Sequence, residues 1–256
     1  MLDKIFKKLR PFLFPLILIL LWEISSFLVG NYSNRYNFIS PTKEIIEAIY
    51  HLFSSTVILP YLFDTLWRTI FSFSISGVFG LLLGMYLGLQ KRAEIIFYST
   101  FDAIRSIPPI ALLPFLILLF GIDDNLKIVF ISFGAIWPIY INTYTAVKNI
   151  EPIYLKVADN LNLSSTIRLR KVIFPSILPG FFSGLKISLS LALILSIVVE
   201  MLTGNTGLGW YLNYSKRNFN YAEMYSMIII IGLLGWIINY LFKKIERKII
   251  FWNYES

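Results

Sequence analysis

The chain has 256 residues, of which 57% are hydrophobic and only 15% are charged, and its formal net charge is +8. Soluble domains carry about 25% charged residues, so this composition excludes an ordinary cytosolic enzyme, a disordered chain and a soluble nucleic-acid binder. It predicts a polytopic, all-α membrane protein, in which the positive charge first reflects lysine and arginine held at the cytoplasmic face.

Six apolar stretches are long enough to cross a membrane, since a helix needs about 20 apolar residues to span about 30 Å of hydrocarbon. They cover residues 11–30, 61–88, 101–120, 125–147, 179–202 and 222–242. The first follows a basic start, as in a signal peptide, but its apolar run is too long and no A-x-A-like site follows it. We therefore expect six transmembrane helices, the first of them uncleaved, with both termini on one side.

Lysine and arginine gather in the loops on one side of the predicted membrane. That side holds Lys4, Lys7, Lys8, Arg10, Lys91, Arg92, Lys148, Lys156, Arg168, Arg170, Lys171, Lys243, Lys244, Arg247 and Lys248. The opposite loops hold Arg35, Lys43, Lys127, Lys216 and Arg217. By the positive-inside rule we expect a multi-pass protein of the cell membrane with both termini in the cytoplasm.

A polar outer segment separates the first two spans. Pro41 just inside a helix start, with Ser40 as N-cap, predicts a short helix lying on the outer surface. His51 falls in this stretch, and we assign it no function.

Small residues four apart line one face of two predicted spans. They are Ser72, Ser76, Gly80, Gly84 and Gly88 in the second span and Gly184, Ser188, Ala192 and Ser196 in the fifth. Residues at i and i+4 share a helix face, and small residues let helix backbones approach closely in lipid. The stripes predict helix packing within the chain, or a face on which helices slide or meet across a dimer.

Prolines interrupt the third span at Pro108, Pro109 and Pro114. A proline has no amide proton, so the carbonyls of Ile104, Arg105 and Ile110 lose their helical partners. In hydrocarbon such carbonyls need other partners or a watery cavity. The break is therefore a candidate for the substrate path, or a simple kink.

Of the charged residues within the predicted spans, Glu23, Lys186 and Glu200 are the awkward ones. An ionised group at the bilayer centre costs at least about 2.5–3.5 kcal/mol, although Lys186 is close enough to the cytoplasmic edge for its side chain to reach the interface. Lys186 and Glu200 are the candidates for a role in the path. No pair among the three has the spacing of a proton relay.

The longest inside loop, about residues 148–178, carries the most information. Pro152 suits the first turn of a helix, and Ile153, Val157 and Leu161 give that helix one apolar face. A short helix held between two membrane spans is typical of a lever that needs a partner, or of an amphipathic loop resting on the bilayer.

A second short helix is predicted in the same loop. Asn162 suits the left-handed conformation that ends the first helix. Ser164 then caps a helix over residues 165–174, which Pro175 stops. This unit is too short, and too closely tied to the membrane, to read DNA.

The residues Lys156-Val157-Ala158, Asn162, Ile173-Phe174-Pro175 and Leu178-Pro179 follow one another with a characteristic spacing. This pattern resembles the EAA loop of binding-protein-dependent ABC importer permeases, in which a Glu-Ala-Ala run precedes a glycine and an apolar–proline pair. Lys156 and Val157 depart from Glu and Ala. Asn162 stands where glycine is usual, and asparagine also accepts a positive φ.

Other motifs are similar to the branch of this family that transports nitrate, sulfonates and taurine. They are Ser40-Pro41, the run from Arg105 to Pro114, Phe120-Gly121-Ile122, Asn142-Thr143, Glu200, Gly207-Leu208-Gly209 and Arg217-Asn218-Phe219. The resemblance runs in order from about residue 41 to residue 247.

The resemblance implies a type I ABC importer transmembrane fold of six helices. Residues 1–60 form the cytoplasmic N-terminus, first span and outer segment, residues 61–245 the transmembrane domain with its coupling loop, and residues 246–256 a cytoplasmic tail. Two such permease subunits, expected to be a homodimer, form the path for a small solute such as a sulfonate, taurine or nitrate. Two ATPase subunits drive transport, and an extracytoplasmic binding protein delivers the solute.

The same resemblance implies two sets of site residues. The loop helix sits in a groove of the ATPase through Val157, Ala158, Asn160, Leu161, Asn162 and Leu163. The translocation path is placed at Pro108, Pro109, Asn142, Lys186 and Glu200. The outer loops with Asp123, Asp124, Lys216 and Arg217 are expected to meet the binding protein.

We expect no enzyme activity, catalytic residue or resident cofactor. The sequence has no Gly-x-x-x-x-Gly-Lys-Ser/Thr loop, so ATP is expected to bind to the separate ATPase. The lack of cysteine and the single histidine argue against a metal site.

Two alternatives belong to other classes. A lipid-modifying membrane enzyme needs clustered histidine or carboxylate groups at the interface, and the few scattered ones here argue against it. A proton- or ion-coupled secondary transporter favours inverted repeats and coupled charges within the membrane.

Overall fold

The computed structural model describes residue 13 and residues 16–28 and 38–253, and these contain helices and loops without a strand. The helices are Leu16–Leu28, α2 (Thr42–Ser54), α3 (Ile58–Leu89), α4 (Lys91–Arg105), the 3₁₀ helix η1 (Pro109–Leu112), α5 (Leu113–Phe120), α6 (Asp124–Lys148), α7 (Pro152–Asn160), α8 (Ser165–Arg168), the π-helix η2 (Leu169–Ile173), α9 (Phe174–Thr203), α10 (Leu208–Arg217), α11 (Tyr221–Ile249) and the 3₁₀ helix η3 (Phe251–Asn253). The all-α class predicted from composition is confirmed for this part of the chain.

The predicted count of six spans is not exact. Four helical runs are long and apolar enough to cross a membrane: α3, α6, Ser165–Thr203 and α11. The pair Lys91–Arg105 and Pro109–Phe120 makes a fifth if its two halves, bent by 85°, count as one span. The predicted span 11–30 falls partly outside the described residues, and the helix within it, Leu16–Leu28, is shorter.

The third predicted span, 101–120, is wrong in its boundaries. The helix α4 begins ten residues earlier, and the chain breaks between α4 and η1 rather than running straight. The amides of Ser106 and Ile107 donate to the carbonyls of Ala103 and Ile104, each at 3.1 Å. The carbonyl of Ile104 that the prolines deprive of a helical partner is thus satisfied by a tight last turn, and the chain then changes direction.

Close backbone approach along the two small-residue stripes holds α3, α6 and α9 together. A Cβ on Gly84 would lie 2.6 Å from the Cβ of Thr143, and one on Gly184 would lie 2.8 Å from the carbonyl oxygen of Pro138. Hydroxyls cross the same interfaces, since Ser188 Oγ donates to the Ala135 carbonyl at 2.6 Å. Both stripes therefore pack helices within the chain, as small residues do in lipid.

The predicted stop at Pro175 is wrong, because α8, η2 and α9 form one helical run from Ser165 to Thr203. Pro175 is the second residue of α9 and lies inside this continuous run. The wider π turn of η2 directly precedes it. At 1.5 Å per residue the 39-residue run is about 58 Å long.

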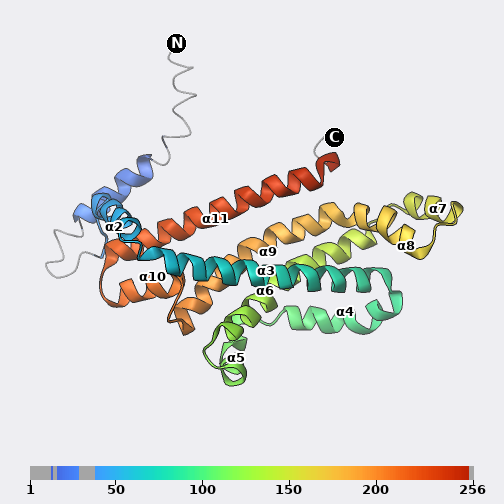
Figure 1. Ribbon diagram of the computed structural model, residues 1–256, viewed down its shortest axis with the longest axis horizontal. Helices are drawn as coiled ribbons and strands as arrows, with labels where there is room; N and C mark the ends of the chain where they lie inside the picture. The colour runs from blue at the N-terminus through green and yellow to red at the C-terminus, as the bar shows by residue number, and fades with distance from the viewer. Residues whose placement is uncertain (1–12, 14–15, 29–37, 254–256) are drawn as a thin grey trace, which may run out of the picture.

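This long helix connects the two ends of the molecule (Figure 1). The helices α7 and α8 lie at one end of the long axis, which we call the tip end, and α2 and α10 lie at the other, which we call the α10 end. The helices α3, α6, α9 and α11 run between the two ends. Each end carries one candidate site.

Candidate functional site

At the tip end, the turn after α7 has the conformation that the sequence predicts. Asn162 has φ +49°, in the left-handed region. The Leu161 and Leu163 amides donate to the carbonyls of Val157 and Ala158 at 3.0 and 3.1 Å. An ion pair of 2.6 Å between Asp159 and Arg168 joins α7 to α8. The tip is thus a closed, hydrogen-bonded turn.

Most of the predicted loop residues point outward from this turn. Leu161 is 66% exposed and Val157 is 47% exposed, and Asn160 and Asn162 are also exposed. Leu163 is half-buried, whereas Ala158 is buried and packs inside the loop. A hollow of about 300 Å³ beside them is lined by Tyr154, Val157, Ala158, Leu161, Leu163, Lys171, Val172, Pro175 and Ser176. The tip therefore carries apolar side chains that no other part of the described chain covers.

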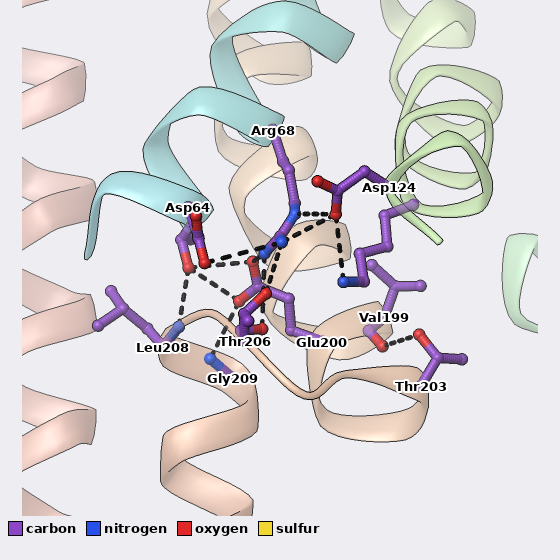
Figure 2. A network of polar contacts seen from close by, with 11 residues as sticks. Asp64, Arg68, Asp124, Val199, Glu200, Thr203, Thr206, Leu208 and Gly209 are labelled. Carbon is purple, nitrogen blue, oxygen red and sulfur yellow. Dashed lines mark hydrogen bonds and ion pairs between the residues drawn. The ribbon is translucent and has the colours of Figure 1, made fainter. Parts of the chain in front are cut away.

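At the α10 end, a buried arginine holds three chain segments at once (Figure 2). The side chain of Arg68, on α3, is only 3% exposed. It donates from Nη1 to Glu200 Oε1 at 3.0 Å, from Nε to Asp124 Oδ1 at 2.9 Å and from Nη2 to Thr206 Oγ1 at 2.6 Å. These partners belong to α9, α6 and the α9–α10 loop. We call Thr65, Arg68, Asp124, Glu200 and Thr206 the Arg68 cluster.

The carboxylate of Glu200 is fully buried and its partners come from three sides. Besides Arg68, it accepts hydrogen bonds from Thr65 Oγ1 at 2.8 Å and from the Gly209 amide at 3.1 Å. Thr65 Oγ1 in turn accepts from the Leu208 amide at 2.9 Å. Because the first amides of a helix have no partner within it, Thr65 and Glu200 cap the start of α10 from two other helices.

The backbone at Gly207 explains the Gly-Leu-Gly motif before and within α10. Gly207 has φ +99°, which side chains rarely allow, and a Cβ there would overlap the carboxylate carbon of Glu200. A glycine is therefore required for Glu200 to reach the start of α10.

Two further charged side chains, Lys127 and Asp64, lie beside the Arg68 cluster. Lys127 is only 2% exposed, with Nζ 3.3 Å from Asp124 Oδ1, and Asp64 Oδ2 lies 3.8 Å from Arg68 Nη2. An open hollow of about 510 Å³ lies beside them, lined by Asp64, Arg68, Ile122, Asp123, Asp124, Asn125, Lys127, Asn205 and Thr206. The buried charges are thus paired, as a low-dielectric interior requires.

The structure brings together only some of the predicted path residues. Pro109 and Asn142 line one hollow of about 440 Å³ where the chain breaks between α4 and α5. The other lining residues are Arg105, Ile107, Gly134, Trp137, Pro138, Ile141, Ile187, Leu191 and Leu195. Pro108 is exposed at the break, and Lys186 is exposed beside Ile187 on α9. Glu200 does not line this hollow but belongs to the Arg68 cluster.

Sequence reasoning missed the role of Arg68. A lone arginine within an apolar span has to find an acidic partner, and this was the available signal. Within the described residues, no three histidine, cysteine or acidic side chains come together as a metal site requires.

Comparisons with known proteins identify relatives that align with most of the chain. The model of the family described as "Binding-protein-dependent transport system inner membrane component" matches residues 77–250. A putative aliphatic sulfonates transport permease protein (SsuC) of Escherichia coli is 32% identical over 96% of the chain and 92% of the relative. A nitrate import permease protein (NrtB) of Leptolyngbya laminosa is 32% identical over 73% of the chain and 67% of the relative.

Solved structures share the fold. An inward-facing MetNI methionine ABC transporter aligns with a TM-score of 0.60 and 23% identity, over 75% of the chain and 97% of the solved chain. An amino acid ABC transporter with histidines aligns with a TM-score of 0.60 and 18% identity, over 78% and 96%. At these identities the likeness shows the fold alone.

Proposed function

The chain belongs to the family of binding-protein-dependent transport system inner membrane components, and on that premise we propose that it forms the translocation path for a small solute and is driven through its tip by a separate ATPase. The family resemblance and the type I importer fold expected from the sequence are confirmed. The chain is a multi-pass membrane protein and a permease subunit of an ABC importer. Its family consists of transport permeases rather than enzymes.

The observation that carries the coupling proposal is the uncovered apolar face of the tip. Ile153, Val157 and Leu161 are 55%, 47% and 66% exposed, and burying such side chains against a partner is favourable by about 25 cal/mol per Å². Asn160, Asn162 and Leu163 complete the docking surface, and Ala158 supports it from inside. The left-handed turn at Asn162 fixes the end of the tip helix α7.

We place the tip end in the cytoplasm, together with both termini. Basic residues at the ends of helices there support this orientation under the positive-inside rule. They include Lys91, Arg92, Lys148, Lys171, Lys244 and Lys248. The α10 end then faces outward, and its loops with Asp123, Asp124, Lys216 and Arg217 receive the binding protein.

For the solute we propose a sulfonate, taurine or nitrate, as expected from the sequence; aliphatic sulfonates and nitrate are also the solutes in the names of two relatives. The path runs past the break in the α4–α5 pair, where Pro109 and Asn142 line the hollow and where Pro108 and Lys186 are exposed. A second copy of the chain completes the path. No cofactor is assigned to this chain, since the partner ATPase binds ATP.

Replacing Leu161 by Asp tests the coupling proposal. A charge on the apolar face of the tip should leave the protein in the membrane but abolish co-purification of the ATPase, because burying an unpaired charge in the ATPase interface is costly. The matched control is Tyr50→Asp, at a residue of α2 that is 75% exposed at the other end. The docking assignment is wrong if Leu161→Asp retains its ATPase and transports normally.

A further inference from the structure

The Arg68 cluster lies at the far end of the helix that begins at the tip. The run from Ser165 to Thr203 is unbroken, and Glu200 is in its last turn. A displacement at the tip therefore reaches Glu200 through one continuous helix. The residues that Glu200 contacts determine which other parts of the chain are displaced with it.

Glu200 contacts the start of α10 by charge and by hydrogen bond. It accepts from the Gly209 amide at 3.1 Å, and a carboxylate at a helix N-terminus is favoured by the helix dipole. Farther along α10, the Asn213 side chain donates to the Met201 carbonyl in the last turn of α9 at 2.9 Å. The helix α10 is thus fastened to the last turn of α9 at two points.

Arg68 fastens the loop between these helices to the other side of the bundle. Nη2 donates to Thr206 Oγ1, while Nε and Nη2 lie 2.9 and 2.8 Å from Asp124 Oδ1 at the start of α6. Only a planar guanidinium presents donors in these three directions at once, and a lysine ammonium does not. The loop Gly204–Gly207 is therefore held between α3, α6 and α9 by one side chain.

We propose that the Arg68 cluster is the joint that transmits movement of the tip helix to α10, and hence to the surface that receives the binding protein. In this proposal, which rests on the proposed function, Arg68 and Glu200 are positioning residues that touch no solute. When the ATPases draw the tip, the last turn of α9 moves, and Glu200 and Arg68 carry the loop and α10 with it. Without the Arg68 cluster, movement of the tip that binds the ATPase is not passed to the α10 end that receives the binding protein.

The test compares Arg68→Lys and Thr206→Val with the parent protein in the reconstituted permease–ATPase complex. Lysine keeps the charge that neutralises Glu200 but loses the fork, and valine keeps the shape of Thr206 but loses its hydroxyl. The control is Lys43→Gln, which removes an exposed ion pair with Glu47 on α2. Basal ATPase activity and its stimulation by the loaded binding protein are measured for each.

We expect both variants to assemble and to keep basal activity. Stimulation should fall at least about fivefold in Arg68→Lys, the lower end of ordinary coupling between distant sites, and by less in Thr206→Val. Lys43→Gln should match the parent. Full stimulation in both variants overturns the proposal, as does an equal loss of basal and stimulated activity, which places the cluster in folding alone.

If Arg68→Lys does not assemble with the ATPase, the Thr206→Val variant alone tests the proposed joint. Reduced stimulation then supports the joint, and normal stimulation overturns it. A failure of the proposed function looks different, because there Leu161→Asp keeps its ATPase, whatever the Arg68 variants do.

Discussion

Single residues at the α10 end show how a membrane protein tolerates buried charge. Glu200 is fully buried, and Arg68 and Lys127 are almost so. Removing one partner of such a pair typically costs about 3–5 kcal/mol, because the other charge stays buried and uncompensated. Glu200 also accepts from Thr65 and Gly209, so most of its hydrogen-bonding capacity is used. Glu200 therefore joins α9 to α3 and to the start of α10.

Gly207 gives a residue-scale prediction. Replacing it by alanine forces a side chain into φ +99° and into the Glu200 carboxylate, at a cost of about 1–3 kcal/mol from the backbone alone. The control is Gly232→Ala in α11, where an added Cβ meets nothing within 4 Å.

Thermal unfolding of the two purified variants in detergent checks this expectation. Gly207→Ala should unfold at a lower temperature than the parent, and Gly232→Ala at the same or a higher one. Equal unfolding temperatures for the two variants would show that Glu200 does not need the glycine beside it.

The sequence predicts Asn162 correctly but not the Arg68–Glu200 pair, and the reason is range. The left-handed turn at Asn162 is set by its own backbone preference and by neighbours within a few residues. Arg68 and Glu200 are 132 residues apart, and their pairing exists only once α3 and α9 are packed. A single sequence shows that each needs a partner, without showing which.

At the scale of elements, the length of the apolar stretches predicts the long helices correctly but gives wrong boundaries for the interrupted ones. The spans predicted at 61–88, 125–147 and 222–242 lie within α3, α6 and α11. The third failed because α4 is amphipathic and its first turns are charged, so its start carries no apolar signal. The stop predicted at Pro175 is wrong because the helix continues from the π turn η2 into α9.

The turn after α7 gives an element-scale prediction. Asn162→Gly should preserve ATPase binding, since glycine adopts φ +49° freely. Asn162→Val should weaken it by roughly tenfold, because a left-handed β-branched residue costs about 1–2 kcal/mol. Titration of purified ATPase against the permease in detergent measures both, and equal affinity in the two variants would remove the turn from the docking surface.

Considered as a whole, the molecule has two working ends joined by a rigid centre. The close approach of α3, α6 and α9 leaves little room for sliding between them, so these three helices move as one body and relative movement falls on the segments outside it. The α4–α5 pair is one such segment, bent by 85° and ending at Gly121, whose φ is +69°. Several apolar side chains of α5 are exposed, Leu118 at 85%.

The central claim, that the tip receives the ATPase, is open to direct capture because the chain contains no cysteine. A thiol-linked photoreactive reagent on Leu161→Cys is then attached at that position alone, with Tyr50→Cys on α2 as the control. Illumination of membranes that contain the complete transporter should join the ATPase to position 161 and not to position 50. Capture at position 161 of only lipid, or of the chain's own helices, would contradict the claim.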